Sequence, residues 1–95
     1  MLGAGVVGQG ILTLLRDNAA AIERRLGASI EVRHVVARDL AKSRGGLIPD
    51  GALSTDPEAV LSDEDVDVVV EVIGGVDPAG GYVERAIESG RSVVT

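Results

Sequence analysis

Apolar side chains recur at spacings of three and four residues, or multiples of these, between Gly8 and Leu26. The positions with this spacing are Ile11, Leu15, Ile22 and Leu26, with Leu12, Leu14 and Ala19 beside them. One face of an α helix has this period, so the pattern predicts a helix about five turns long. Arg24 and Arg25 would place cations in its last turn, and Gly27 supplies a left-handed cap.

β-Branched residues gather in three later segments and predict strands. Residues 66–73 are nearly continuous in valine and isoleucine, as is typical of a strand covered on both faces of a parallel sheet. Residues 29–37 predict a half-exposed strand, because charged side chains interrupt the valines. Residues 91–95 begin a further strand.

The segments between these strands contain turn and helix-start signals. Residues 38–55 are polar and rich in glycine, which predicts a long irregular loop. Asp56 and Pro57 predict the start of a short helix, and Asp77 and Pro78 the start of another. Helices and strands therefore alternate, which predicts an α/β domain with a parallel sheet and flanking helices.

Composition excludes several classes of function. The net charge is −6 and aromatic residues make up 1% of the chain, which argues against a nucleic-acid partner. The sequence has no cysteine, so disulfides, thiolate catalysis and a cysteine-bound zinc are excluded. No apolar run is long enough to span a membrane, and we expect a cytoplasmic protein.

The sequence Gly3-Ala4-Gly5-Val6-Val7-Gly8 matches the dinucleotide-binding pattern G-x-G-x-x-G. In that pattern a strand leads into a tight glycine turn, and the following helix points its free N–H groups at a pyrophosphate. Only Met1 and Leu2 precede the motif, so we expect the first strand to be largely missing. With the strand order 3-2-1-4, it would lie between the second and fourth strands. We therefore expect a gap or a re-paired sheet.

The end of the second predicted strand bears on the choice of dinucleotide. An acid there hydrogen-bonds the ribose 2′-hydroxyl of NAD, whereas an arginine can pair with the 2′-phosphate of NADP. Arg38 occupies this place and favours NADP, with NAD possible because Asp39 follows it. The Asp39 carboxylate can either accept a hydrogen bond from a ribose hydroxyl or neutralise the charge of Arg38. Lys42 and Arg44 either add positive electrostatic potential near Arg38 or are ordinary solvated charges of the loop.

Other candidate residues have simpler interpretations. Gly74-Gly75 follows the 66–73 strand and either admits the nicotinamide side of a cofactor or forms a plain turn. The acidic residues at 63–67 lack the spacing of a calcium loop and are expected to be solvated, so no metal site is predicted. His34 has no catalytic partner pattern and is expected to be structural.

Taken together, these segments resemble the N-terminal nucleotide-binding domain of homoserine dehydrogenase over nearly all of the chain. The most specific part is the ending Glu71-Val72-Ile73-Gly74-Gly75 on the strand that begins Asp65-Val66-Asp67. The resemblance also rests on the segments 3–10, 14–16, 36–42, 55–58 and 90–95.

The resemblance implies a Rossmann-type fold and an oxidoreductase that interconverts aspartate semialdehyde and homoserine with NAD(P)H, in threonine and methionine biosynthesis. It implies cofactor contacts at Gly3, Gly5, Val6, Val7, Gly8, Arg38, Gly74, Gly75 and Thr95. In the family an Ala-Asn-Lys sequence, the substrate-handling residues and the oligomer interface follow the position of Thr95. We therefore expect residues 1–95 to be a partial domain, cut at both ends, without catalytic residues or turnover of its own. The full-length parent would be a homo-oligomer that acts on a small-molecule substrate.

Three other interpretations remain open from the residues alone. A sugar or inositol dehydrogenase shares the Asp-Val-Asp-Val-Val segment, although the histidine usual there is absent after Ile73. The chain can also be a stand-alone dinucleotide-binding or regulatory module, or a fragment without independent function.

Overall fold

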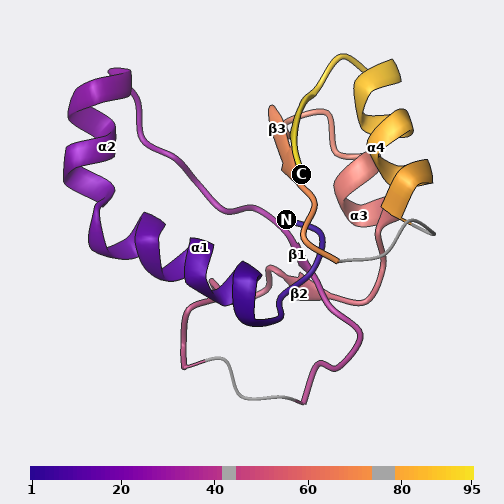
Figure 1. Ribbon diagram of the computed structural model, residues 1–95, viewed down its shortest axis with the longest axis horizontal. Helices are drawn as coiled ribbons and strands as arrows, with labels where there is room; N and C mark the ends of the chain where they lie inside the picture. Colours follow the sequence, from indigo (N-terminus) through magenta and orange to yellow (C-terminus); the bar gives the residue numbers. More distant parts are fainter. Residues whose placement is uncertain (42–44, 74–78) are drawn as a thin grey trace.

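The computed structural model describes residues 1–41, 45–73 and 79–95. Its elements in chain order are α1 (Val6–Asp17), α2 (Ala19–Leu26), β1 (Val35–Val36), β2 (Leu53–Ser54), α3 (Glu58–Leu61), β3 (Val68–Val70), α4 (Ala79–Glu88) and β4 (Ser92–Val94). β1 pairs with β2 and β3 pairs with β4, both in parallel. α1 and the pair α3 and α4 lie on opposite sides of these strands (Figure 1). The predicted α/β class with parallel strands and flanking helices is confirmed.

Leu2 lies between the two strand pairs and joins them. It forms parallel bridges to Val36 and to Glu71. Its N–H donates to the carbonyl oxygen of Val70 at 2.7 Å, and its own carbonyl oxygen accepts the N–H of Val72 at 2.9 Å. The expected gap is therefore present between two separate two-stranded sheets, and the isolated bridges of Leu2 span it.

The predicted strand order needs one correction. The order 3-2-1-4 was applied to residues 29–37, 66–73 and 91–95 as the second, third and fourth strands. Residues 66–73 were therefore expected to neighbour residues 29–37, and residues 91–95 were expected to lie beside Met1 and Leu2. Instead β2, which falls inside the predicted loop 38–55, pairs with β1, while β3 neighbours Leu2. β2 has only two residues, too few to produce a hydrophobic period, so the pattern could not reveal it.

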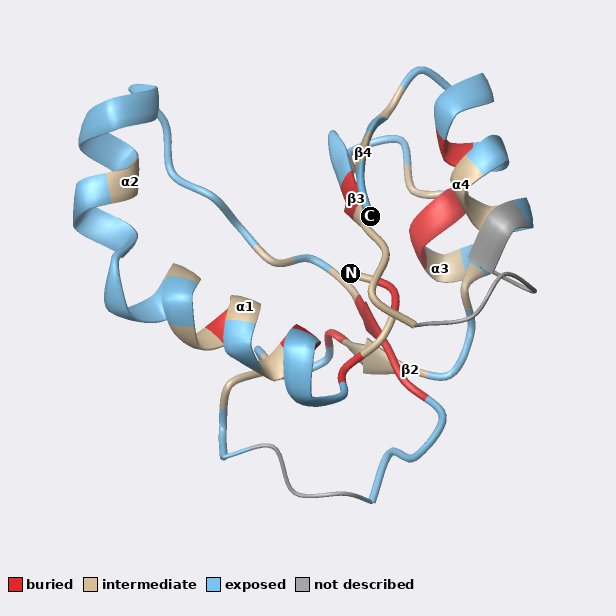
Figure 2. Cartoon of the chain, viewed as in Figure 1, coloured by how far each residue is buried: buried red, intermediate tan, exposed pale blue. Residues whose placement is uncertain are grey.

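The core is aliphatic and has two parts on opposite sides of Leu2 and β1. The larger cluster of buried side chains consists of Leu2, Val36, Val60, Leu61, Val69 and Ala86. A smaller cluster contains Ala4, Val35 and Ala37. Buried residues therefore concentrate around the central strands, whereas α2 contains none (Figure 2).

The predicted helix over residues 8–26 is two helices, because it breaks at Asn18. This residue has φ −114° and ψ 17°, outside the helical region. Its backbone N–H and its side-chain amide both donate to the carbonyl oxygen of Leu14, each at 3.0 Å. Asparagine side chains compete with helical hydrogen bonds in this way. The predicted end at Gly27 is confirmed, since Gly27 has φ 72° and caps α2.

The other predicted strands are shorter than expected. Only Val35–Val36 of the segment 29–37, and Val68–Val70 of the segment 66–73, form strand ladders. The expectation that 66–73 is covered on both faces is wrong, because Val68 is 51% exposed. In the described residues these strands pair with β2 over two residues and with β4 over three.

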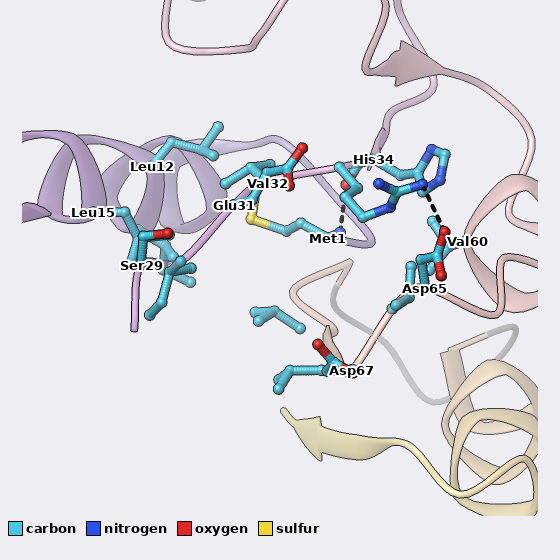
Figure 3. A pocket seen from close by; sticks show the side chains of 16 residues that line it. Met1, Leu12, Leu15, Ser29, Glu31, Val32, His34, Val60, Asp65 and Asp67 are labelled. Atoms are coloured by element: carbon cyan, nitrogen blue, oxygen red, sulfur yellow. Dashed lines mark hydrogen bonds and ion pairs between the residues drawn. The ribbon is translucent and has the colours of Figure 1, made fainter. Parts of the chain in front are cut away.

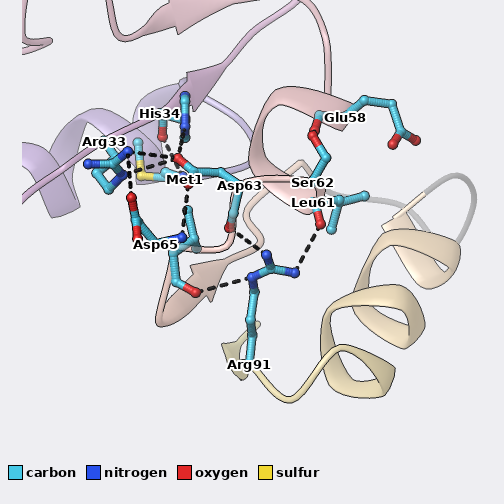
Figure 4. Close-up of polar contacts among 10 residues, drawn as sticks. Met1, Arg33, His34, Glu58, Leu61, Ser62, Asp63, Asp65 and Arg91 are labelled. Atoms are coloured by element: carbon cyan, nitrogen blue, oxygen red, sulfur yellow. Dashed lines mark hydrogen bonds and ion pairs between the residues drawn. The ribbon is translucent and has the colours of Figure 1, made fainter.

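Polar contacts tie the two halves of the fold together near Met1. The Met1 amino group donates to the carbonyl oxygen of His34 at 2.6 Å (Figure 3). The Asp63 carboxylate contacts the Nε2 atom of His34 at 2.6 Å and accepts from the Arg33 guanidinium at 3.0 Å (Figure 4). Arg91 donates to the carbonyl oxygens of Leu61, Asp63 and Val66. His34 and Asp63 thus connect the segment before β1 to the turn after α3.

These contacts predict a pH dependence of stability. Hydrogen bonds from the His34 side chain, the Asp65 backbone N–H and Arg33 lower the pKa of Asp63 from 3.8 to about 2. A carboxylate whose folded-state pKa is lowered stabilises the fold above its unfolded-state value, and this contribution is lost as the pH falls through the folded-state value. Asp63→Asn should therefore destabilise the protein near neutral pH, with a difference from the wild type that shrinks between about pH 4 and pH 2.

Urea unfolding at several pH values measures this difference. Asp67→Asn is the matched control, because it removes an equal charge at an exposed position nearby. If Asp63→Asn stays less stable than the wild type by a constant amount down to pH 2, the lowered pKa assigned to Asp63 is contradicted.

Candidate dinucleotide-binding site

The glycine loop leads from Leu2 directly into α1. Gly5 is the N-cap residue of α1, with φ −78° and no side chain to cap the helix. The first intrahelical bond runs from the Gln9 N–H to the Gly5 carbonyl oxygen, so the N–H groups of the first turn have no acceptor within the helix. Val6 and Val7 in this turn are 88% and 63% exposed. Such an open helix N-terminus attracts anions.

The three glycines of the motif meet different surroundings. A Cβ atom on Gly3 would lie 3.0 Å from the backbone carbon of Val72, and Gly3 has φ 105°. A Cβ atom on Gly8 would lie 2.8 Å from the carbonyl oxygen of Gly3. A Cβ atom on Gly5 would meet nothing within 4 Å. Gly3 and Gly8 therefore allow close backbone packing, while Gly5 leaves open space beside the loop.

A cavity of about 680 Å³ adjoins this loop at the carboxyl ends of β1, β2 and β3. Its lining residues are Gly3, Ala4, Gly5, Val36, Ala37, Arg38, Asp39, Thr55, Pro57, Val72, Ile73 and Tyr82. Ligands of parallel α/β sheets bind in the crevice at this edge, and the volume is in the range of small-molecule sites. The cavity thus combines the glycine loop, the helix start and the strand ends in one place.

The predicted site residues divide into three groups. Gly3, Gly5 and Arg38 line the cavity. Val6 and Val7 lie at the exposed helix start, Gly8 is buried against Gly3, and Thr95 is exposed after β4; none of these lines the cavity. The predictions for Gly74, Gly75, Lys42 and Arg44 fall outside the described residues.

Several lining residues were not predicted as site residues. Thr55 and Pro57 follow β2, and they were missed because β2 itself was not recognised. Tyr82 lies on α4 and lines the cavity as well. Its aromatic ring was the signal that could have found it, since no other aromatic residue occurs in the sequence.

Charge at the mouth of the cavity comes from Arg38 and Asp39, which are both exposed. The Asp39 carboxylate accepts the backbone N–H of Ala41 at 2.9 Å, a turn-stabilising contact within its own loop. Arg38 directly follows the buried Ala37 at the carboxyl end of β1. The arginine is thus held at the cavity edge by the strand, which suits it to an anionic ligand group.

The family model described as "Homoserine dehydrogenase, NAD binding domain" matches residues 3–95. The chain belongs to this family. It is therefore a nicotinamide dinucleotide-binding domain of the homoserine dehydrogenase type, as the glycine motif and the Glu71–Gly75 segment predicted. A sugar or inositol dehydrogenase and a stand-alone module are not favoured.

Curated homoserine dehydrogenases align with the whole chain. The protein of Bacillus subtilis is 37% identical over 95 residues, and that of Neisseria gonorrhoeae is 42% identical over 95 residues. In both cases the alignment covers 100% of this homoserine dehydrogenase-type chain and 22% of the relative. The chain thus spans about a fifth of the length of the relatives it matches.

Solved structures show the same fold. The crystal structure of S. aureus homoserine dehydrogenase at pH 6.5 superposes with a TM-score of 0.88 and 32% identity, covering 97% of this chain and 23% of that one. The structure from Thiobacillus denitrificans gives a TM-score of 0.86 and 45% identity, covering 97% and 21%. The predicted Rossmann-type architecture is confirmed. Among the described helices of this homoserine dehydrogenase-type domain, none has the length and apolar character to cross a membrane.

Proposed function

We propose that the chain forms the cofactor-binding part of an enzyme that interconverts aspartate semialdehyde and homoserine, and that it prefers NADP to NAD. The cavity at the carboxyl ends of β1, β2 and β3 supports this proposal most directly, because it brings Gly5, the start of α1 and Arg38 together. The family match and the relatives named homoserine dehydrogenase support the reaction. Production of homoserine would serve threonine and methionine biosynthesis in the cytoplasm.

The residues around the cavity fit a dinucleotide. Open space beside Gly5 lets a pyrophosphate approach the backbone, and the free N–H groups of the first turn of α1 donate to its oxygens. Arg38 lies where the strand end meets the adenine ribose, and its planar guanidinium can bind a 2′-phosphate through two hydrogen bonds. When bound, the nicotinamide cofactor exchanges a hydride with the substrate. The role of the chain itself is to bind and orient this cofactor.

Thr55, Pro57 and Tyr82 complete the cavity wall. Thr55 and Pro57 come from the turn between β2 and α3, beside the strand end that bears Arg38. In a parallel sheet, consecutive strand ends flank the same part of a ligand. These residues would therefore contact the adenosine half of the cofactor. Val72 and Ile73, after β3, would lie towards its nicotinamide half.

The NADP preference can be tested by Arg38→Ala. Loss of a charge-assisted, two-pronged contact to the 2′-phosphate should weaken NADPH binding about tenfold, with NADH binding changed far less. Isothermal titration with both nucleotides measures the difference. Arg24→Ala serves as the control, because it removes the same charge from an exposed position on α2. Equal losses for the two nucleotides, or a wild type that prefers NADH, would overturn the assignment of Arg38.

A further inference from the structure

Gln9 contacts the glycine loop through both its backbone and its side chain. Its backbone N–H donates to the Gly5 carbonyl oxygen at 2.9 Å, and its side-chain nitrogen Nε2 donates to the Ala4 carbonyl oxygen at 3.0 Å. The first bond forms in any α helix that begins at this position, whereas the second requires a side-chain donor at residue 9. The pattern G-x-G-x-x-G ends at Gly8, so it does not specify this residue.

The position of Gln9 in α1 explains how its side chain reaches the loop. Helical side chains tilt towards the N-terminus of their helix, so a residue near the start of α1 extends over the residues that precede it. Gln9 is half-buried and Ala4 is 5% exposed, which limits the competition of water for their hydrogen bond. A carbonyl oxygen only accepts, so the nitrogen of the amide must face Ala4.

The two bonds fix the directions of two consecutive peptide groups. In a planar trans peptide, the C=O and the N–H point in opposite directions. Since the Ala4 carbonyl oxygen points to the Gln9 side chain, the N–H of Gly5 points away from it. Since the Gly5 carbonyl oxygen points to the Gln9 backbone, the N–H of Val6 points out of the helix start. In the described part of the chain, neither of these N–H groups has an acceptor.

The space around these two N–H groups is open to a ligand. A Cβ atom on Gly5 would meet nothing within 4 Å, and Val6 is 88% exposed. Gly5 also lines the cavity at the carboxyl ends of β1, β2 and β3. Consecutive backbone N–H groups at a helix start bind anions when they are directed at the same point.

A fixed peptide orientation reduces the cost of binding. Glycine residues have more conformational freedom than other residues, and a loop that becomes ordered only on binding loses affinity for that reason. The Gly3 N–H is held by the Val36 carbonyl oxygen at 2.8 Å, at the start of the loop. Gln9 holds the next two carbonyl oxygens. The loop is therefore ordered at both ends before a ligand arrives.

We propose that Gln9 is a positioning residue, which holds the peptide group between Ala4 and Gly5 so that its N–H faces the pyrophosphate of the dinucleotide. This inference rests on the proposed function, because it assigns Gln9 a role at the same site. Gln9 acts through the loop backbone and does not need to touch the cofactor. Its effect should therefore be limited to ligands that carry a pyrophosphate.

The test compares Gln9→Met with Thr13→Val in the full 95-residue chain. Methionine keeps the unbranched length of glutamine but has no N–H donor. The Thr13 hydroxyl donates to the Gln9 carbonyl oxygen at 2.9 Å, so Thr13→Val removes a side-chain contact one turn further along α1 that does not involve the loop. NMR titrations use NADPH and adenosine 2′-phosphate, which has the phosphate assigned to Arg38 but no pyrophosphate. Urea unfolding compares the stabilities of the two variants.

Gln9→Met should bind NADPH about fivefold more weakly than the wild type, as expected for the loss of one neutral hydrogen bond. Its affinity for adenosine 2′-phosphate should be retained, and so should the NADPH affinity of Thr13→Val. In the wild type, NADPH should shift the Gly5 amide proton downfield, because this N–H gains an anionic acceptor, and adenosine 2′-phosphate should not.

Three results would overturn the role of Gln9. They are an unchanged NADPH affinity in Gln9→Met, an equal weakening for both ligands or both variants, and the absence of the Gly5 shift in a wild type that binds NADPH. The last of these needs no variant to fold. A wild type that binds no NADPH would instead overturn the proposed function, and this inference with it.

Discussion

Replacement of Gly3 by alanine should destabilise the domain by about 2–4 kcal/mol, through the positive φ angle and backbone overpacking together. Gly3 has φ 105°, and an added Cβ atom would lie 3.0 Å from both the carbon and the oxygen of the Val72 carbonyl. Those atoms cannot move freely, because the Val72 N–H is bonded to the Leu2 carbonyl oxygen. Urea unfolding measures the loss, and a variant that fails to fold agrees with the expectation.

Gly5→Ala is the matched control in the same loop. Gly5 has a negative φ angle, and an added Cβ atom meets nothing within 4 Å. Its unfolding free energy should therefore stay within about 0.5 kcal/mol of the wild type. Equal losses for Gly3→Ala and Gly5→Ala would contradict the separate roles assigned to the two glycines.

Replacement of Leu2 by alanine should cost about 2–5 kcal/mol, as expected for a fully buried leucine. Leu2 is 0% exposed and packs in the larger core cluster with Val60, Val69 and Ala86. Its backbone also bridges the two strand pairs, so a cavity at this position loosens both halves together. Thermal and urea unfolding should show a lower midpoint for the whole domain.

Leu14→Ala provides the control for the leucine substitution. Leu14 lies on α1 and is 56% exposed, so removal of the same atoms should change the unfolding free energy by less than about 1 kcal/mol. If Leu2→Ala were no more destabilising than Leu14→Ala, the core-packing role assigned to the Leu2 side chain would be contradicted.

Local signals in the sequence predicted the element types but not their extents. Gly27 marks a helix end because glycine tolerates its positive φ angle, and this predicted end is confirmed. The break at Asn18 was missed, since it depends on a side-chain hydrogen bond that hydrophobic spacing does not encode. β2 was missed because its two residues are held by pairing with β1, a contact between distant parts of the chain.

Residues of the candidate site could be predicted from the sequence where a local motif or a strand end determines their position. Gly3 and Gly5 follow from the motif, and Arg38 follows from its place after a strand. Thr55 and Tyr82 were not predictable as cavity residues, because their positions depend on how β2 and α4 meet the glycine loop in space. The bridging of the two strand pairs by Leu2 was also missed, because two residues carry no strand pattern of their own.

The central claim is that the cavity beside Gly5 binds a nicotinamide dinucleotide. The most direct measurement is an NMR titration of the isotope-labelled chain with NADPH, compared with Gly5→Val, whose side chain fills the open space beside the loop. The account predicts saturable amide shifts at Gly3, Gly5, Arg38 and Thr55 in the wild type, and their loss in the folded variant. Saturable binding that leaves these amides unchanged, or that persists undiminished in Gly5→Val, would contradict it.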